Sequence, residues 1–146
     1  MTNDELAPAM PSDQELRSIL GEAKTIAVVG LSSKPHRDSH EVAEYLQHKG
    51  YRIIPVNPNK TEVLGEKAYP SLLDVPEKVD VVDVFRRAEY TPEISRQAVE
   101  IGAKVLWLQD GIVNEEAWGI AQDAGLDVAM GACIRRTSKR LEREAS

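Results

Sequence analysis

Residues 25–33, with the sequence TIAVVGLSS, constrain the fold of this 146-residue chain more than any other stretch. An apolar strand runs there into a Gly/Ser turn, and the amphipathic segment 38–49 follows closely. A buried parallel strand that ends on glycine and leads into a helix presents backbone N–H groups and a helix N-terminus to one small space, which suits a phosphate. The stretch therefore predicts an α/β domain that holds a nucleotide.

A second pattern recurs along the chain: an amphipathic stretch ends on glycine, at Gly50, Gly102 and Gly125, and an apolar strand begins at once. Glycine after a helix end supplies the left-handed cap, so each instance predicts a return from helix to strand. Near-continuous apolar runs rich in Val and Ile are typical of buried parallel strands. The expected strands are Thr25–Gly30, Arg52–Val56, Val79–Val84, Lys104–Leu108 and Asp127–Met130.

Helix starts are predicted from capping residues and from proline at the first helical position. The pattern places helices near 13–20, 39–49, 92–101 and 115–124, a short helix or turn at 72–76 and a polar helix over 134–144. The predicted starts are Ser12 with Glu15, Asp38 with Glu41, Thr91 followed by Pro92, and Asn114 followed by Glu115 and Glu116.

These elements predict an α/β fold: a Rossmann-like, doubly wound, five-stranded parallel sheet with strand order 3-2-1-4-5 and helices on both faces. In such a sheet the ligand crevice lies where the order reverses, here at the carboxyl ends of strands 1 and 4. Residues 1–11 are expected to be a flexible N-terminal lead-in and residues 12–146 a single domain.

Composition excludes several classes of function. With 18 basic and 24 acidic residues the net charge is −6, which argues against broad binding of nucleic acid. The single cysteine excludes an internal disulfide and fits a reducing compartment. The sequence contains no apolar run of 18 residues, so no membrane-spanning segment is predicted. The N-terminus has acidic residues and prolines where a signal peptide has cations and a hydrophobic segment. The chain is expected to be cytoplasmic.

The loop after the first strand carries Gly30, Ser32, Ser33, Lys34 and Arg37. Glycine lets the backbone approach a pyrophosphate, the serines donate to its oxygens, and the two cations supply charge. The second and third glycines of a G-x-G-x-x-G motif are missing, so a plain turn with capping serines stays open as an alternative.

The second strand leads into Asn57 and Pro58, an extended wall that can line an adenosine pocket or serve only as a rigid connector. An NAD-binding unit usually places an acid at this point, and here Lys60 lies nearby instead. The third strand leads into Phe85 and Arg86, which suit stacking on adenine and bonding to a phosphate. The alternative is that Phe85 belongs to the core and Arg86 to the solvated surface, with no ligand bound by either.

The fourth strand leads into Gln109 and Gly111, expected to lie across the crevice from Gly30. A simple turn is the alternative there. The three histidines have no partners at metal-ligand spacing, so no metal site is predicted. Cys133 has no evident base and is interpreted as a buried, inert thiol. The basic run 135–143 is interpreted as solvated helix surface, with contact to a phosphate or to a partner as the alternative. No catalytic residue is predicted.

Four segments together, IAVVGLSS (26–33), GYRIIPVNP (50–58), DVVDVFRR (80–87) and WLQDGI (107–112), resemble the small stand-alone CoA-binding proteins. These proteins are similar to the N-terminal CoA-binding domain of the succinyl-CoA synthetase α subunit. The resemblance covers roughly residues 13–134 and implies a Rossmann-like domain that holds coenzyme A. It assigns the pyrophosphate to Gly30, Ser32 and Ser33 with Lys34 and Arg37, the adenosine side to Asn57 and Pro58, the nucleotide to Phe85 and Arg86, and the pantetheine path to Gln109 and Gly111.

One corner departs from the family pattern: members often read Met-Asp-Arg-Cys-Ile after the last strand, and this chain reads MGACI over residues 130–134. The first hypothesis is therefore binding of coenzyme A or an acyl-CoA without catalysis by this chain alone. The alternatives are an NADP-dependent oxidoreductase or redox sensor on the same fold, and a docking subunit of a larger acyl-CoA enzyme. A protein partner or a homo-oligomer is compatible with CoA binding and with the docking subunit.

Overall fold

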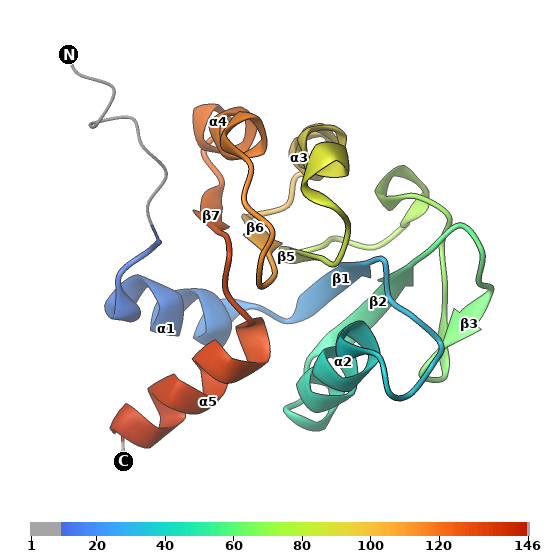
Figure 1. Cartoon of the computed structure of the whole chain (residues 1–146), viewed down its shortest axis with the longest axis horizontal. Coiled ribbons are helices and arrows are strands. Elements are labelled where there is room, and N and C mark those ends of the chain that lie inside the picture. Colours follow the sequence, from blue (N-terminus) through green and yellow to red (C-terminus); the bar gives the residue numbers. More distant parts are fainter. Residues whose placement is uncertain (1–9, 146) are drawn as a thin grey trace.

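A five-stranded parallel sheet forms the middle layer of the computed structural model, which describes residues 10–145 (Figure 1). The predicted α/β, Rossmann-like fold with five parallel strands is confirmed. Most of the predicted lead-in, residues 1–9, lies outside the described residues. The strands in sheet order are β2 (Arg52–Val56), β1 (Thr25–Val29), β5 (Val81–Val84), β6 (Val105–Leu108) and β7 (Asp127–Ala129).

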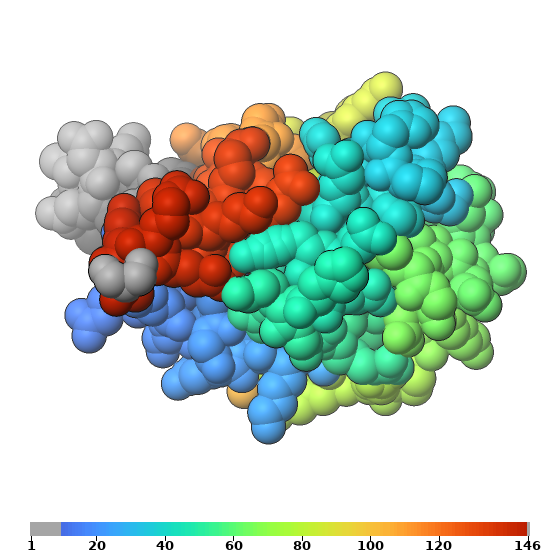
Figure 2. Space-filling model, turned by 90° about the horizontal axis from the view of Figure 1, so that it is seen from below, coloured from blue at the N-terminus to red at the C-terminus, as the bar shows by residue number. Residues whose placement is uncertain are grey.

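Helices cover both faces of the sheet, three on one side and two on the other (Figure 1). The first face carries α1 (Asp13–Glu22), α2 (Asp38–His48) and α5 (Ile134–Ala145), with α5 in contact with both α1 and α2 (Figure 2). The second face carries α3 (Thr91–Glu100) and α4 (Glu115–Asp123). Connecting segments add the hairpin of β3 (Glu62–Val63) and β4 (Glu66–Lys67) and the short 3₁₀ helices η2 (Leu72–Asp74) and η3 (Ala88–Tyr90).

Two apolar cores result from the alternation of side chains along each strand. In β1, Ile26 and Val28 pack toward α1, α2 and α5, whereas Ala27 and Val29 pack toward α3 and α4. The interior strands are buried on both faces, which explains why their sequences are near-continuous apolar runs. Polar residues that could form a site therefore come from the loops at the ends of the strands.

Two predicted helix caps are confirmed. Ser12 and Glu15 form a reciprocal capping box, because the Glu15 N–H donates to Ser12 Oγ at 3.1 Å and the Ser12 N–H donates to Glu15 Oε1 at 3.2 Å. Asn114 caps α4 through its Oδ1, which accepts from the Ala117 N–H at 2.8 Å.

Two other predicted caps are wrong. Asp38 and Thr91 are the first residues of α2 and α3, and the residues in the cap positions are Arg37 and Tyr90, neither of which makes a side-chain capping bond. The Thr91 hydroxyl instead donates to the Ala88 carbonyl at 2.6 Å, because η3 runs directly into α3. The N-terminus of α2 is thus left without a side-chain cap.

The predicted strand order is wrong in one respect. In the numbering of the five expected strands the observed order is 2-1-3-4-5, so β5, the expected third strand, pairs with β1 and not with β2. This is the other common doubly wound order, and its reversal lies between the first and third strands. The crevice therefore opens between the carboxyl ends of β1 and β5, not between the first and fourth strands.

The outer edge of β2 shows why the third strand cannot pair there. The Tyr69 N–H donates to the Pro55 carbonyl at 3.0 Å, and the Asn57 N–H donates to the Tyr69 carbonyl at 2.9 Å. The returning chain thus occupies the edge that the predicted order reserves for a strand. Pro55 indicates from the sequence that its strand lies at the edge of the sheet, because proline inside a strand is confined to sheet edges.

Candidate functional site

Gly30 sits where the loops after β1 and β5 approach each other at the reversal of strand order. Its φ is +86°, and a Cβ there would lie 2.6 Å from the Phe85 carbonyl oxygen and 3.1 Å from Arg86 Cδ. Glycine is required both by the left-handed backbone and by this close approach. Gly30 therefore faces the loop after the expected third strand.

The central cavity, about 530 Å³, opens above Gly30 against the start of α2. The Ser32 N–H donates to Ser39 Oγ at 3.0 Å, and the Lys34 N–H donates to Ser32 Oγ at 3.1 Å, so hydroxyls fix the shape of the loop. The cavity adjoins the N-terminus of α2, where partial positive charge favours anions. Its lining residues are Gly30, Ser32, Lys34, His36, Arg37, Asp38, Ser39 and Phe85.

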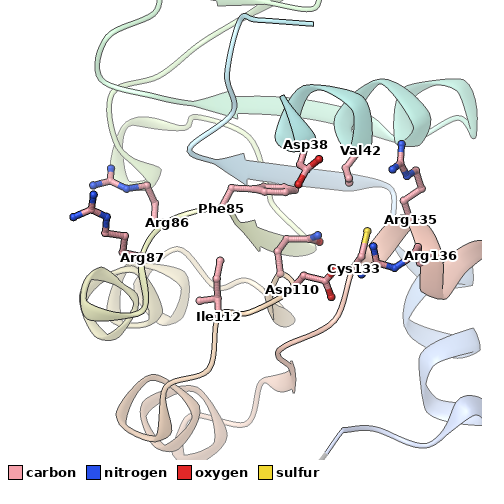
Figure 3. A pocket seen from close by; sticks show the side chains of 11 residues that line it. Asp38, Val42, Phe85, Arg86, Arg87, Asp110, Ile112, Cys133, Arg135 and Arg136 are labelled. Carbon is pink, nitrogen blue, oxygen red and sulfur yellow. Dashed lines mark ion pairs between the residues drawn. The ribbon is translucent and has the colours of Figure 1, made fainter. Parts of the chain in front are cut away.

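A second cavity, about 350 Å³, lies between α2, the ends of β5 and β6, and the start of α5; we call it the arginine cavity (Figure 3). Four arginines and two aspartates share its lining with apolar side chains. Arg136 forms an ion pair with Asp110, and Arg135 Nη1 lies 3.9 Å from Glu41 Oε2. The lining residues are Asp38, Val42, Phe85, Arg86, Arg87, Gln109, Asp110, Ile112, Cys133, Arg135 and Arg136.

A third cavity, about 210 Å³, lies on the opposite side of the sheet edge, between the loop after β2, η2 and α3; we call it the apolar cavity. The Arg86 guanidinium lies 4.6 Å from the centre of the Tyr90 ring, a cation–π contact at its wall. The lining residues are Val29, Val56, Pro58, Pro70, Ser71, Leu72, Arg86, Tyr90, Glu93, Ile94 and Gln97.

The three cavities follow one another across the carboxyl edge of the sheet, because they share lining residues. Phe85 and Asp38 line both the central cavity and the arginine cavity, and Arg86 lines both the arginine cavity and the apolar cavity. The loop after β5 thus stands at the junction of all three. Together they form a groove that passes over the sheet from the face of α3 to the face of α2 and α5.

A buried carboxyl lies two residues before Phe85 on the same strand face. Asp83 is fully buried, and neither of its carboxyl oxygens has a hydrogen-bond partner among the described residues. Burial raises the pKa of this carboxyl well above its usual range, because charge is costly away from water. The core beneath Phe85 thus contains a polar group to which the described residues offer no hydrogen bond.

The structure brings eight of the eleven predicted site residues to the groove. They are Gly30, Ser32, Lys34, Arg37, Pro58, Phe85, Arg86 and Gln109. Gln109 is 4% exposed, and its Oε1 accepts from the Ile134 N–H at 3.1 Å, so it also anchors the start of α5.

Three predicted residues line none of these cavities: Ser33, Asn57 and Gly111. Asn57 has a structural task, because its Nδ2 donates to the Leu31 carbonyl at 3.0 Å and its Oδ1 accepts from the Asn59 N–H at 2.9 Å. It ties the loop after β2 to the loop after β1. Ser33 and Gly111 are exposed in the loops that border the groove.

Sequence reasoning missed several lining residues, notably Cys133, Arg135 and Arg136 at the start of α5. These residues follow β7, two strands away from the switch point, so their position in sequence gives no reason to place them beside Phe85. The available signal was the run of cations that begins at Arg135, directly after the last strand. Tyr90, Arg87 and Asp110 were missed as well.

Residues 10–145 contain no group of three or more His, Cys, Asp and Glu side chains that could hold a metal ion. Across that range, no helix combines the length and the hydropathy needed to cross a membrane.

The fold and the groove define a Rossmann-like α/β domain whose crevice lies at the carboxyl edge of a doubly wound sheet. The family model described as a CoA binding domain matches residues 24–137, and the chain belongs to that family. The match begins one residue before β1 and extends into α5. It therefore includes every loop that borders the groove.

Individual proteins show the same relationship. The chain is 46% identical over 125 residues to the protein YneT of Bacillus subtilis (strain 168), covering 86% of this chain and 93% of that one. The structure of a hypothetical protein from Pyrococcus horikoshii OT3 superimposes with a TM-score of 0.89 at 43% identity, covering 93% and 98% of the two chains.

A longer relative is an enzyme. The acetate–CoA ligase (ADP-forming) II of Archaeoglobus fulgidus is 34% identical over 83 residues. That match covers 56% of this chain and only 12% of the ligase.

Proposed function

We propose that this chain binds coenzyme A or an acyl-CoA along the groove and does not catalyse a reaction alone. The observation that carries the proposal is that three cavities of different character meet at the loop after β5: an apolar cavity, a polar cationic cavity and a mixed cavity. Coenzyme A is likewise built of three parts of different character, an aromatic base, phosphates and a long pantetheine arm. The family and the ligase relative support the same ligand.

The central cavity is the proposed place of the pyrophosphate. Gly30 lets the ligand approach the backbone, Ser32 offers polar groups, and Lys34 and Arg37 supply charge. Asp38 is in the first turn of α2 and opposes an anion on the helix axis, so the phosphates should lie toward Ser32 and the cations.

The apolar cavity is the proposed place of the adenosine. Pro58 and Tyr90 provide flat apolar surface there, and Arg86 lies at the junction with the phosphates. Asn57 contributes by holding the wall in place through its bond to the Leu31 carbonyl.

The pantetheine arm is proposed to pass Phe85 and Gln109 into the arginine cavity. Ser33 and Gly111 border this path through their loops. We propose no catalytic role for this lining, in which Cys133 is a free, buried cysteine. We place the protein in the cytoplasm, since a single free thiol fits a reducing compartment.

Calorimetric titration with CoA, dephospho-CoA, NAD and NADP at one salt concentration tests the proposal. We expect CoA to bind, dephospho-CoA to bind more weakly, and NAD not to bind. Binding of NADP alone would instead favour the oxidoreductase or redox sensor. Lys34→Ala and Arg86→Ala should each weaken CoA binding about ten-fold, as expected for loss of a charge-assisted phosphate contact.

A docking subunit of a larger acyl-CoA enzyme is the second candidate function. Tyr90 and Val113 are large apolar side chains that are 45% and 57% exposed, in the segments that follow β5 and β6. The ligase relative contains much more chain than the part that this protein matches. Co-purification of a stable partner, lost when Val113 is replaced by a polar residue, would support this candidate. A monodisperse protein without such a partner would count against it.

A further inference from the structure

The arginine cavity carries cations at two separate ends. Figure 3 shows Arg86 and Arg87 on one side and Arg135 and Arg136 on the other, with Phe85 and other lining residues between them. The first pair comes from the loop after β5, and the second from the first turn of α5. One cationic end therefore adjoins the apolar cavity, which Arg86 also lines, and the other lies at the start of α5.

Coenzyme A itself has no charge for the second end. Its phosphates all belong to the nucleotide, for which Lys34, Arg37 and Arg86 are available in the central and apolar cavities. The pantetheine arm is uncharged and ends in a thiol. If the nucleotide lies in the proposed place, the far end of the ligand reaches the Arg135 guanidinium. Coenzyme A has no negatively charged group at that end to pair with it.

Arg135 has the environment of an anion receptor. Its side chain is 29% exposed, the lowest value among the arginines that form ion pairs within residues 10–145. Its partner Glu41 is 46% exposed and lies 3.9 Å away, beyond hydrogen-bond distance. A partly desolvated guanidinium binds a carboxylate through two parallel hydrogen bonds more strongly than an exposed one.

The backbone beside Arg135 adds to the same field. Arg135 is the second residue of α5, and the first turn of that helix carries no acidic side chain. The positive end of the helix therefore reinforces the arginine. Val42, Ile112 and Cys133 line the cavity nearby and give an apolar wall that suits methylene groups.

We infer that the ligand is an acyl-CoA whose acyl group ends in a carboxylate, and that Arg135 is the residue that selects it. The inference rests on the proposed function, because it takes the nucleotide to lie in the central and apolar cavities. The thioester would follow the pantetheine path, the methylenes would lie along the apolar wall, and the terminal carboxylate would bind Arg135. Arg136 is held by Asp110 and shapes the rim.

Affinities for matched acyl-CoA pairs test the inference. Glutaryl-CoA and pentanoyl-CoA have acyl chains of equal length, as do succinyl-CoA and butyryl-CoA, and each pair differs in the terminal carboxylate. We expect the wild-type protein to prefer the dicarboxylic member of at least one pair about ten-fold, and Arg135→Gln to reduce that preference to less than about two-fold. Affinity for free CoA should stay within about two-fold. Arg143→Gln, on the same helix but outside the cavity lining, should retain the preference.

Three results would overturn the inference. The wild-type protein would show no preference within either pair, or Arg135→Gln would leave the preference intact, or it would weaken CoA and both acyl-CoAs equally. The last result would mean that Arg135 binds a phosphate of CoA itself. Failure of the wild-type protein to bind CoA at all would instead overturn the proposed function, and this inference with it.

Discussion

At the scale of single residues, Gly30 is the position where the fold depends most on a missing side chain. We expect Gly30→Ala to lower the free energy of unfolding by about 2–4 kcal/mol, because a left-handed backbone and a Cβ against the Phe85 carbonyl add their costs. Urea denaturation of the two proteins measures the difference. Backbone atoms cannot move away as a flexible side chain would, so the clash must shift the loop after β5.

Gly119 offers a matched control. It lies within α4, and a Cβ there would meet nothing within 4 Å. Gly119→Ala should therefore raise the free energy of unfolding by about 0.5–1 kcal/mol through the helix propensity of alanine. If Gly30→Ala were as stable as the wild type, the close approach of the two loops would be wrong.

Asp83 makes a prediction about pH. Burial raises the pKa of its carboxyl, so the folded protein keeps a proton that the unfolded chain releases above about pH 4. Stability attributable to Asp83 therefore falls as pH rises, by about 1.4 kcal/mol per unit, until pH reaches the raised pKa. Asp83→Asn removes this dependence, so urea denaturation from pH 4.5 to 8 should show the variant gaining stability relative to the wild type as pH rises. Parallel stability curves would contradict the expectation.

Asp80, the residue before β5, should change stability with pH in the opposite direction to Asp83. Burial alone would raise the pKa of its carboxyl, but N–H donation from Lys24 at 2.9 Å and Thr25 at 3.0 Å, together with Lys104, lowers it. The stability that Asp80 contributes is present above the unfolded pKa and is lost as pH falls through the folded pKa. Asp80→Asn should therefore lose stability relative to the wild type most at neutral pH and least in acid, in the same measurement.

At the scale of elements, Asn114 connects two loops of the groove. Its Oδ1 caps α4, and its Nδ2 donates to the Ala88 carbonyl of η3 at 3.1 Å. Asn114→Ala removes both bonds and should cost about 1–2 kcal/mol. Asn114→Asp keeps the cap and loses only the bond to Ala88, so it should cost about half as much. Wild-type stability of Asn114→Asp in urea denaturation would show that the link between the loops contributes nothing.

The strands and helices were predictable because each depends on local chemistry, but their order was not. Apolar runs and glycine caps placed five strands, with ends within two residues of the observed ones. The order depends on where the chain after β2 returns, and that return is fixed by Tyr69 pairing with the edge of β2. Pro55 was the local signal for an edge strand.

The groove was predictable to a similar degree. Loops after β1 and β5 carry glycine, serine and cations, whose chemistry is legible in the sequence. The start of α5 joins the same cavity only because α5 packs back across the sheet beside α2, a contact between residues far apart in the chain. Periodicity could assign α5 its polar surface but could not say which part of it faces Phe85.

At the scale of the whole molecule, the groove joins both faces of the sheet, so a bound ligand should stabilise the domain as a unit. Coenzyme A at one hundred times its dissociation constant adds about 2.7 kcal/mol to the free energy of unfolding by mass action. For a chain of this size that corresponds to a rise in Tm of about 5–10 °C. Thermal unfolding with CoA, and with NAD at the same concentration as control, measures it.

The same experiment separates a groove that spans the sheet from a site on one face. Lys34→Ala in the central cavity and Arg86→Ala at the junction with the apolar cavity should each reduce the shift caused by a fixed CoA concentration. Arg17→Ala, on the exposed face of α1 beside Glu144, should leave it unchanged. A shift that depended on Lys34 alone would confine the ligand to the central cavity, since the nucleotide would then not reach across the edge of the sheet.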